Sequence, residues 1–164
     1  MHFEGDQTIH APRQTVWDFL MNPDNVASCA PGFQSMQTID EDHYKPTLAV
    51  GVGAVKATFT LDVTISERDA PTHAAVLAHG MAAGSAVDMR SGMDLSPEPD
   101  TPDATHLHWV ADVTVSGTLA SMGARLMEGT AHKLTNRFFD CLRQKLEASP
   151  SGQAAGAGEP APAT

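Results

Sequence analysis

Residue types on which many enzymes and nucleic-acid-binding proteins depend are scarce in this sequence. It has one tyrosine and two cysteines, and aromatic residues make up 5% of its 164 positions. Ten lysines and arginines face 20 aspartates and glutamates, and the resulting net charge of −10 argues against a nucleic-acid partner. No apolar run approaches the ~18–20 residues of a membrane-spanning helix. The first residues carry neither a basic nor an apolar segment, so we expect no signal peptide.

The two cysteines, Cys29 and Cys141, lie far apart in the sequence and fit no metal-binding spacing. We therefore expect reduced thiols in a cytosolic protein. The chain is long enough for one domain with a hydrophobic core, which we expect over residues 1–147. Residues 148–164 are mainly Ala, Gly, Pro and Ser, which predicts a disordered tail.

Motifs for catalysis and metal binding are also missing. There is no nucleophile elbow, phosphate-binding loop or dinucleotide fingerprint. His106 and His108 share one face of an expected strand, opposite Trp109, which places them toward solvent without a suitably spaced third ligand. Asp88 and Asp94 share a strand face typical of a solvated surface. We predict neither catalytic residues nor metal ligands.

The longest regular pattern runs from Leu119 to Glu147. Its apolar residues recur every three or four positions without a proline, which predicts one long helix with an apolar stripe. Thr118 is its expected N-cap. Small residues surround Met122 and Leu126, so the first half of the helix is thin and could cover something other than side chains. Five basic against three acidic residues give either an ordinary solvated face or one that meets an acidic surface or anionic lipid.

The residues before this helix predict a sheet. A strand at 3–10 and two short helices, at 12–20 and 24–28, precede six consecutive strands. The six are expected at 33–39, 44–50, 55–66, 73–81, 85–95 and 107–115. An antiparallel sheet with one solvated face needs cover on the other, and the long helix is the available cover. We therefore predict an α+β fold in which a curved seven-stranded antiparallel sheet wraps around the C-terminal helix.

The two ends of the expected sheet differ in chemistry. The acidic turns are 40–42, 67–72 and 96–103, and the uncharged segments are 29–32, 51–54, 82–85 and 116–118. Because surface turns are usually polar, the uncharged end is either a set of tight glycine turns or the mouth of an apolar cavity. Such a mouth would contact a membrane or a hydrophobic partner. The contact residues expected there are Pro31, Val52, Gly53, Ala54, Ala82, Ala83, Gly84 and Gly117.

Methionines support a cavity behind this end, although each alone is typical of a plain core. Methionine fills irregular space and tolerates varied ligands, and a helix over a concave sheet leaves room for a ligand of ~300–1,000 Å³. His79 is expected to point inward as a buried, hydrogen-bonded histidine. The ligand-binding residues we predict are Leu20, Phe59, Leu61, Met81, Met89, Met93, Trp109, Val113, Leu119, Met122 and Leu126.

Short motifs extend along the whole chain. They are Ala-Pro-Arg-Gln-Thr-Val-Trp-Asp-Phe-Leu at 11–20, Asn-Pro at 22–23, Val-Ala-Ser-Cys-Ala-Pro-Gly at 26–32, Gly-Ser-Ala at 84–86, Trp-Val-Ala-Asp-Val at 109–113, Gly-Thr-Leu-Ala at 117–120 and Arg-Phe-Phe at 137–139. Together they resemble the CoxG family of carbon monoxide dehydrogenase subunits, within the START-like (SRPBCC) superfamily, over residues 1 to 147. The resemblance implies a helix-grip fold, in agreement with the sheet and helix expected above.

The resemblance also implies a non-catalytic accessory protein. The family is associated with molybdenum–copper carbon monoxide dehydrogenase and related hydroxylases, and with their attachment to the cytoplasmic membrane. The superfamily implies a cavity for a hydrophobic small molecule. Combined with the apolar mouth, this predicts a protein that binds a respiratory quinone such as menaquinone, or a similar isoprenoid lipid. It would take this ligand from the inner face of the cytoplasmic membrane, with no covalently bound cofactor.

Two other classes stay open. Some superfamily members are cyclases or dioxygenase subunits, but such an enzyme should place an acid, a base or a tyrosine in its cavity. Here Tyr44 lies beside a turn at the acidic end. An assembly or membrane-recruitment scaffold without ligand would instead have a packed interior beneath Met122 and Leu126.

Overall fold

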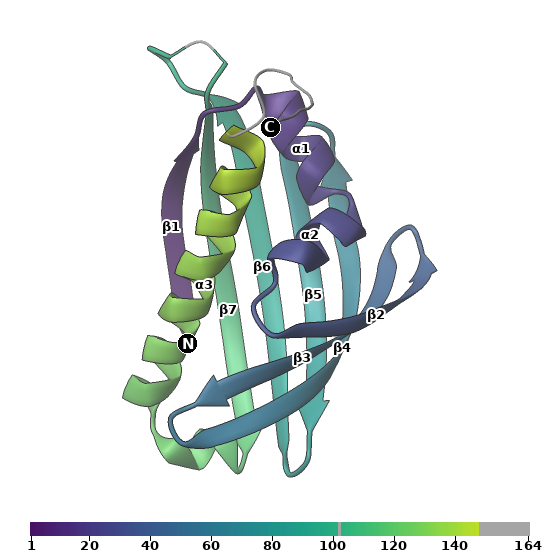
Figure 1. Cartoon of the computed structure of the whole chain (residues 1–164), viewed down its shortest axis with the longest axis vertical. Helices are drawn as coiled ribbons and strands as arrows, with labels where there is room; N and C mark the ends of the chain where they lie inside the picture. The colour runs from purple at the N-terminus through teal and green to yellow at the C-terminus, as the bar shows by residue number, and fades with distance from the viewer. Residues whose placement is uncertain (102, 148–164) are drawn as a thin grey trace, which may run out of the picture.

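A computed structural model describes residues 1–101 and 103–147 (Figure 1). The tail predicted at 148–164 lies outside the described residues. The elements are β1 (His2–Ile9), α1 (Arg13–Leu20), α2 (Pro23–Cys29), β2 (Phe33–Asp40), β3 (His43–Val52), β4 (Val55–Asp69), β5 (His73–Ala82), β6 (Ser85–Pro97), β7 (Thr105–Gly117), the 3-10 helix η1 (Leu119–Met122) and α3 (Ala124–Glu147).

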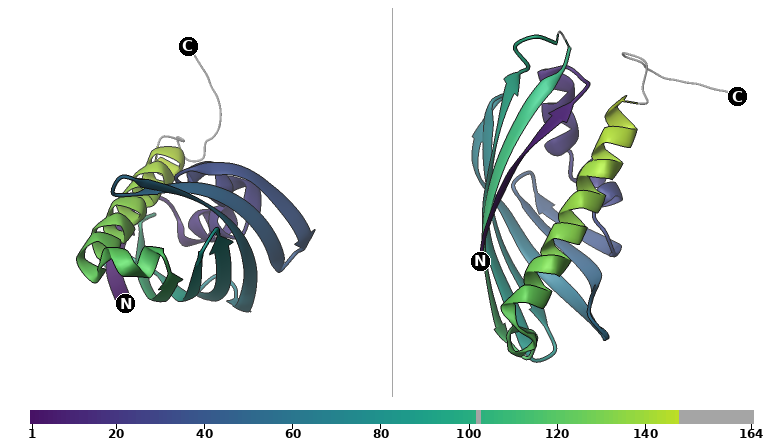
Figure 2. Two further views of the ribbon diagram at one scale, coloured as in Figure 1. Left: turned by 90° about the horizontal axis from the view of Figure 1, so that it is seen from below. Right: turned by 90° about the vertical axis from the view of Figure 1, so that its left-hand side faces the viewer.

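Seven strands form one antiparallel sheet in the order β1-β7-β6-β5-β4-β3-β2. Strands β2 to β7 follow one another as a meander, and β1 closes against β7. The sheet curves around α3, as the view from below in Figure 2 shows. The predicted α+β architecture, a curved sheet around a C-terminal helix with two short helices after β1, is confirmed.

Alternation along the strands sets the two faces of the sheet. In β4, Phe59 is buried while Thr58 and Thr60 are exposed. In β7, Leu107 is buried and Asp112 is exposed. Because side chains alternate across a strand, each half-polar strand buries one apolar row against the helices and leaves the other in solvent.

Strand β5 has the opposite phase to the one predicted. Met81 is 60% exposed on the outer face, and His79 Nδ1 lies 2.6 Å from Asp88 Oδ1 on that same face. The inner face has no room for a side chain at Gly80, because a Cβ there would lie 2.1 Å from Leu61 Cδ2. Leu61 of β4 fills this space. The prediction that Met81 and His79 point inward is therefore wrong.

The C-terminal segment is two helices and not one. Gly123 separates η1 from α3 with φ of 98°, a conformation that L-residues rarely adopt. Thr118 occupies the N-cap position of η1, as predicted, but it has helical φ and ψ and makes no side-chain cap bond. The backbone N–H of Leu119 instead donates to the Ser85 hydroxyl at 3.0 Å. The apolar spacing continues across Gly123, which is why the sequence pattern concealed the break.

The core is concentrated at one end of the molecule. The larger cluster of buried residues comprises Ile9, Ala11, Val16, Trp17, Phe19, Cys29, Ala74, Leu95, Leu107, Phe139, Leu142 and Leu146. A smaller cluster at the other end contains Val52, Phe59 and Leu119. The buried residues of α3 are Phe139, Leu142 and Leu146, so its first half contributes none. The half of α3 that the sequence predicted to be thin is the half that does not pack deeply.

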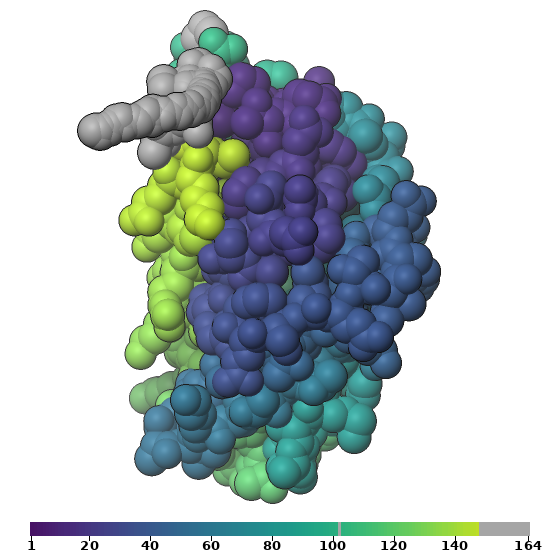
Figure 3. All heavy atoms as spheres, turned by 45° about the vertical axis from the view of Figure 1, so that its right-hand side comes forward, coloured from purple at the N-terminus to yellow at the C-terminus, as the bar shows by residue number. Residues whose placement is uncertain are grey.

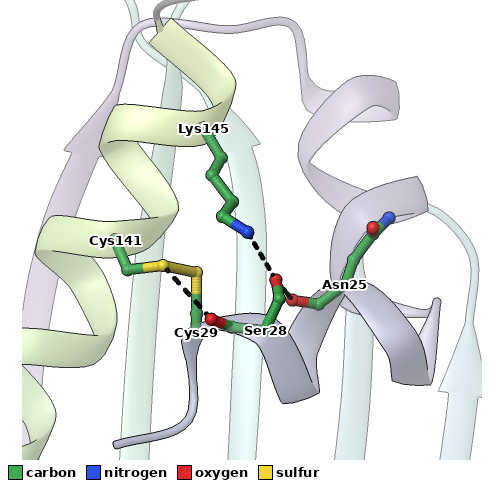
Figure 4. Close-up of a disulfide and its surroundings, with 5 residues drawn as sticks. All are labelled: Asn25, Ser28, Cys29, Cys141 and Lys145. Carbon is green, nitrogen blue, oxygen red and sulfur yellow. Dashed lines mark hydrogen bonds between the residues drawn. A yellow bond between two sulfur atoms is a disulfide. The ribbon is translucent and has the colours of Figure 1, made fainter.

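Cys29 and Cys141 form a disulfide that joins the end of α2 to α3 (Figure 4). Their Cα atoms are 5.5 Å apart, although the two residues are separated by 112 positions in sequence. The predicted free thiols are therefore wrong, because the sequence does not reveal that α3 returns past α2. Lys145 Nζ donates to the Ser28 hydroxyl at 2.7 Å and forms a second link between the same helices. Disulfides persist in oxidising surroundings, so the cysteines no longer support a cytosolic location.

Candidate functional site

A groove of about 1040 Å³ lies between the first half of α3 and strand β3. In Figure 3, α3 in green to yellow lies along one edge of the molecule, and the blue residues of β2 to β4 extend across the view to its lower part. From the sheet side the lining residues are Pro31, Gly32, Ala49, Val50, Gly51 and Gly53. From the helix side they are Met122, Gly123, Arg125, Leu126, Gly129, Thr130, Lys133, Leu134 and Arg137.

Glycines create this groove, because they leave open the space that larger side chains would fill. A Cβ added at Gly51, Gly123 or Gly129 would meet nothing within 4 Å. At the turn between β3 and β4 the two walls touch, since a Cβ at Gly53 would lie 3.3 Å from Leu126 Cδ2. The groove is therefore open along the helix and narrows at the β3–β4 turn.

The lining combines apolar walls with cations. Val50, Met122, Leu126 and Leu134 supply apolar surface, whereas Arg125, Lys133 and Arg137 supply positive charge. Aspartate, glutamate, histidine and tyrosine are absent from the described residues that line it. This combination suits an apolar or amphiphilic ligand and offers no acid–base pair to act on it.

The predicted ligand-binding residues divide among five places. Met122 and Leu126 line the groove, and Met81 lies on the outer face. Phe59, Leu61, Leu119 and Met122 belong to the smaller cluster, whereas Leu20, Met93 and Trp109 pack against the larger one. Met89 and Val113 are partly buried partners on adjacent strands β6 and β7. The structure does not bring all of them to one cavity.

The residues predicted to contact a membrane or a hydrophobic partner also lie in different places. Pro31 and Gly53 line the groove, and Val52 is buried. The turns that hold Ala82, Ala83, Gly84 and Gly117 pack on each other, because the Thr118 N–H donates to the Gly84 carbonyl at 2.9 Å. Ala54, Ala83, Gly84 and Gly117 are exposed at this end. Tight glycine turns thus form the uncharged end, and the groove opens beside α3.

The groove residues that the sequence does not reveal are mainly small or cationic. Gly51, Gly129 and Thr130 carry no signal of their own, because their contribution is the absence of bulk. In the sequence, Lys133 and Arg137 stand out only as part of a basic helix face. Their spacing of four residues places them on one side of the helix, which the sequence does indicate. It does not indicate which side of the helix faces β3.

A second hollow of about 400 Å³ adjoins the groove. Its lining includes the disulfide residues Cys29 and Cys141, and it shares Pro31, Gly32 and Arg137 with the groove. The disulfide therefore holds α3 next to the segment that forms one wall of both hollows.

The outer face of the sheet carries histidine–carboxylate pairs. Asp6 Oδ1 lies 2.9 Å from both His106 Nε2 and His108 Nδ1. The hydrogen bond with His108 is the main reason that the pKa of Asp6 is lowered below 3.8. Strand β1 brings Asp6 between these histidines, which sequence spacing could not show. Within the part of the chain that the structure describes, no three such residues are arranged to hold a metal ion.

Another such pair lies across β5 and β6. His73 Nδ1 is 2.8 Å from Asp94 Oδ1, and its Nε2 is 3.0 Å from Glu67 Oε1. The hydrogen bond with Asp94 is the main cause that raises the pKa of His73 above 6.5. These groups face away from the groove, so they act on surface charge and not on a bound ligand.

Comparison with known families gives one match by sequence model. The model described as the CoxG subunit of carbon monoxide dehydrogenase matches residues 5–147. No curated protein matches the sequence.

Several solved structures share the fold. A conserved protein from Geobacillus kaustophilus superposes with a TM-score of 0.84 at 27% identity, over 90% of this chain and 96% of that one. A START superfamily protein from Mycobacterium smegmatis gives 0.68 at 10% identity, over 90% and 97%. The Zhui aromatase/cyclase from Streptomyces sp. R1128 gives 0.69 at 16% identity, over 94% and 99%. The last two likenesses establish a START-like fold and nothing about chemistry.

Proposed function

The chain belongs to the CoxG family of carbon monoxide dehydrogenase subunits, and on this premise we propose a non-catalytic accessory protein of a molybdenum-containing carbon monoxide dehydrogenase or related hydroxylase. It binds a hydrophobic ligand in the groove between α3 and β3 and links the dehydrogenase to the inner face of the cytoplasmic membrane. The ligand is a respiratory quinone such as menaquinone or another isoprenoid lipid.

The groove is the observation that carries this proposal. Its volume of about 1040 Å³ reaches the size of small-molecule sites, which typically span ~300–1,000 Å³. The residues of α3 above it, from Ala124 to Phe138, are exposed or only partly buried. A filled interior would have buried the apolar side chains that the helix turns toward the groove, such as Leu126 and Leu134, so the ligand-carrying function is favoured over a scaffold with a packed core.

The membrane contact rests on exposed apolar side chains of three elements, with Leu126 in the groove lining, Val55 at the start of β4 and Met81 on the outer face of β5. Met81 is 60% exposed, Val55 43% and Leu126 37%. Among residues 1–101 and 103–147, no helix is long and apolar enough to span a bilayer. The attachment we propose is peripheral, with the exposed apolar side chains at the lipid surface.

Organic extraction and mass spectrometry of protein purified from its native host tests the proposal. We expect a stoichiometric quinone or isoprenoid. Gly129→Trp should abolish ligand retention, because Gly129 lines the groove, a Cβ there meets nothing within 4 Å, and the indole would occupy space that the ligand needs. The matched control is Gln144→Trp, an exposed position on the same helix that does not line the groove.

Two results would contradict the proposal. One is a protein that stays empty even after incubation with quinone-loaded liposomes, which would favour a recruitment scaffold. The other is equal ligand content in Gly129→Trp and Gln144→Trp, which would remove the ligand from this groove.

A further inference from the structure

The groove has a charge opposite to that of the protein as a whole. Among the described residues, three cations and no acid line it, whereas the whole chain carries a net charge of −10. Arg125, Lys133 and Arg137 are all exposed. The ion pairs that lysine and arginine make within the described residues involve Lys45, Arg68 and Arg143.

None of the three acids of α3 lines the groove, and two of them bind other groups. Asp140 pairs with Arg143 at 2.7 Å, and Glu147 accepts from the backbone N–H of His10 at 2.8 Å. Glu128 is exposed and is not part of the groove lining. The side of α3 that faces the groove therefore carries positive charge that the acidic side chains of the same helix do not neutralise.

The spacing of the cations points to a shared counter-ion. Lys133 and Arg137 are four residues apart, so they project from adjacent turns on one side of α3. Like charges in this arrangement repel each other and destabilise the helix unless an anion lies between them. Arg125 lies about 12 Å further along the helix, near the narrow end.

Apolar surface runs beside these cations. Leu134 and Thr130 of the helix and Val50 of β3 line the same groove, and Leu126 and Met122 continue the apolar surface toward Gly53. An extended hydrocarbon chain fits this surface. A carboxylate or phosphate at its end would accept hydrogen bonds from the ammonium and guanidinium groups.

We infer that the groove selects an amphiphile with an anionic head group, a carboxylate or a phosphate, over a neutral one of equal chain length. Lys133 and Arg137 bind the head group, and the hydrocarbon chain lies along Val50, Leu126 and Leu134. The inference rests on the proposed ligand-carrying function of this groove. Between a neutral quinone and another isoprenoid lipid, it favours the anionic isoprenoid.

A matched pair of probes tests the selection. Farnesol and farnesyl phosphate have the same chain and differ in head-group charge. Calorimetric titration of the full chain, below the concentration at which either probe forms micelles, should show at least tenfold tighter binding of farnesyl phosphate. Raising the salt concentration should weaken binding of the phosphate but not of the alcohol.

Two double variants then test whether Lys133 and Arg137 cause the preference for farnesyl phosphate. Lys133→Gln/Arg137→Gln should reduce the preference at least tenfold while farnesol affinity stays the same. The control, Arg13→Gln/Arg90→Gln, removes two cations that do not line the groove and should keep the preference. Far-ultraviolet circular dichroism and a thermal melt establish that both double variants are folded.

Equal affinity for the two probes, or the same loss of preference in both double variants, would overturn the inference. If the probes bind equally and Gly129→Trp blocks both, the selection is wrong but the ligand-carrying function stands. If neither probe nor a menaquinone binds the wild-type protein, the proposed function fails as well.

Discussion

At Gly32 the backbone alone decides which residue is tolerated. Its φ is 78°, and a Cβ there would lie 1.9 Å from the Ala49 carbonyl oxygen. The same two residues are hydrogen-bonded, because the Ala49 N–H donates to the Gly32 carbonyl at 2.8 Å. This contact holds the Cys29–Gly32 segment against β3 and so fixes one wall of the groove.

We expect Gly32→Ala to destabilise the protein by at least about 2 kcal/mol, since strain and a backbone clash act together. Chemical denaturation monitored by tryptophan fluorescence measures this change. A loss below about 0.5 kcal/mol, the range of ordinary surface substitutions, would mean that the segment is not held as described.

Titration of His73 gives a prediction about pH. Its pKa is raised above 6.5 in the folded protein, chiefly by the hydrogen bond with Asp94. The protonated imidazole therefore stabilises the fold fully below pH 6.5, and this stabilisation is lost as pH rises through the raised pKa. His2, whose pKa is raised chiefly by its hydrogen bond with Asp112, acts in the same direction.

The free energy of unfolding should accordingly fall as the pH rises above 6.5 and passes through the raised pKa of His73. His73→Gln should flatten this slope, as measured by denaturation at several pH values. An unchanged slope in that variant would show that the pairing with Asp94 does not contribute.

Among the elements, the break between η1 and α3 is the feature most open to test. Gly123 has φ of 98° and ψ of 146°, and a Cβ there would meet nothing within 4 Å. We expect Gly123→Ala to cost about 1–3 kcal/mol from backbone strain alone. Gly129→Ala, in the interior of α3, should instead stabilise the protein by about 0.5–1 kcal/mol.

Thermal unfolding of the two alanine variants compares these effects directly. If Gly123→Ala stabilised the protein as Gly129→Ala does, η1 and α3 would form one continuous helix in solution, as the sequence alone predicts.

Sequence patterns predict the elements better than they predict which way each element faces. Apolar and polar residues alternate along β4, and along β7 with the exception of Val110, so their inward rows, with Phe59 and Trp109, follow from the sequence. Strand β5 has alanine and glycine on its inner face and Leu77 and Met81 on its outer face. Hydrophobicity therefore indicates the wrong phase, because Leu61 of the neighbouring strand supplies the bulk at Gly80.

The site is predictable only in part, for a related reason. The thin first half of α3 and the basic character of the helix are properties of one segment, and the sequence contains both. The groove, the Asp6 bridge between two histidines and the disulfide all depend on segments far apart in sequence. The register of the strands and the position of α3 bring these segments together. A local sequence pattern predicts neither the register nor the position.

At the scale of the whole molecule, the hydrophobic core holds α3 mainly through the second half of this helix. The disulfide adds a covalent link between that half and the end of α2. Cys29 and Cys141 enclose β2 to β7 in one covalent loop. A cross-link over about 100 residues is expected to stabilise a protein by about 2–5 kcal/mol, mainly by restricting the unfolded chain.

Reduction should therefore lower the melting temperature of the wild-type protein. Cys29→Ser/Cys141→Ser should melt at the lower temperature with or without reductant, and calorimetry measures both. If reductant did not change the melting temperature of the wild type, the pair would not be oxidised in solution.

The state of this pair in the cell bears on the proposed location. Alkylation of free thiols in rapidly lysed native cells, followed by mass spectrometry, should leave Cys29 and Cys141 unmodified if the disulfide exists there. Complete alkylation would favour the reduced thiols that a cytosolic location predicts.

The same loop has a consequence for cleavage of the chain. A protease that cuts any turn between β2 and β7 opens a ring at one point, and the two pieces stay covalently joined through residues 29 and 141. The nicked protein should run as one band on a non-reducing gel and as two after reduction. Strand β1 lies outside the ring, so after a cut before Cys29 it is held only by non-covalent contacts, chiefly its pairing with β7 and its packing against α3 and the core.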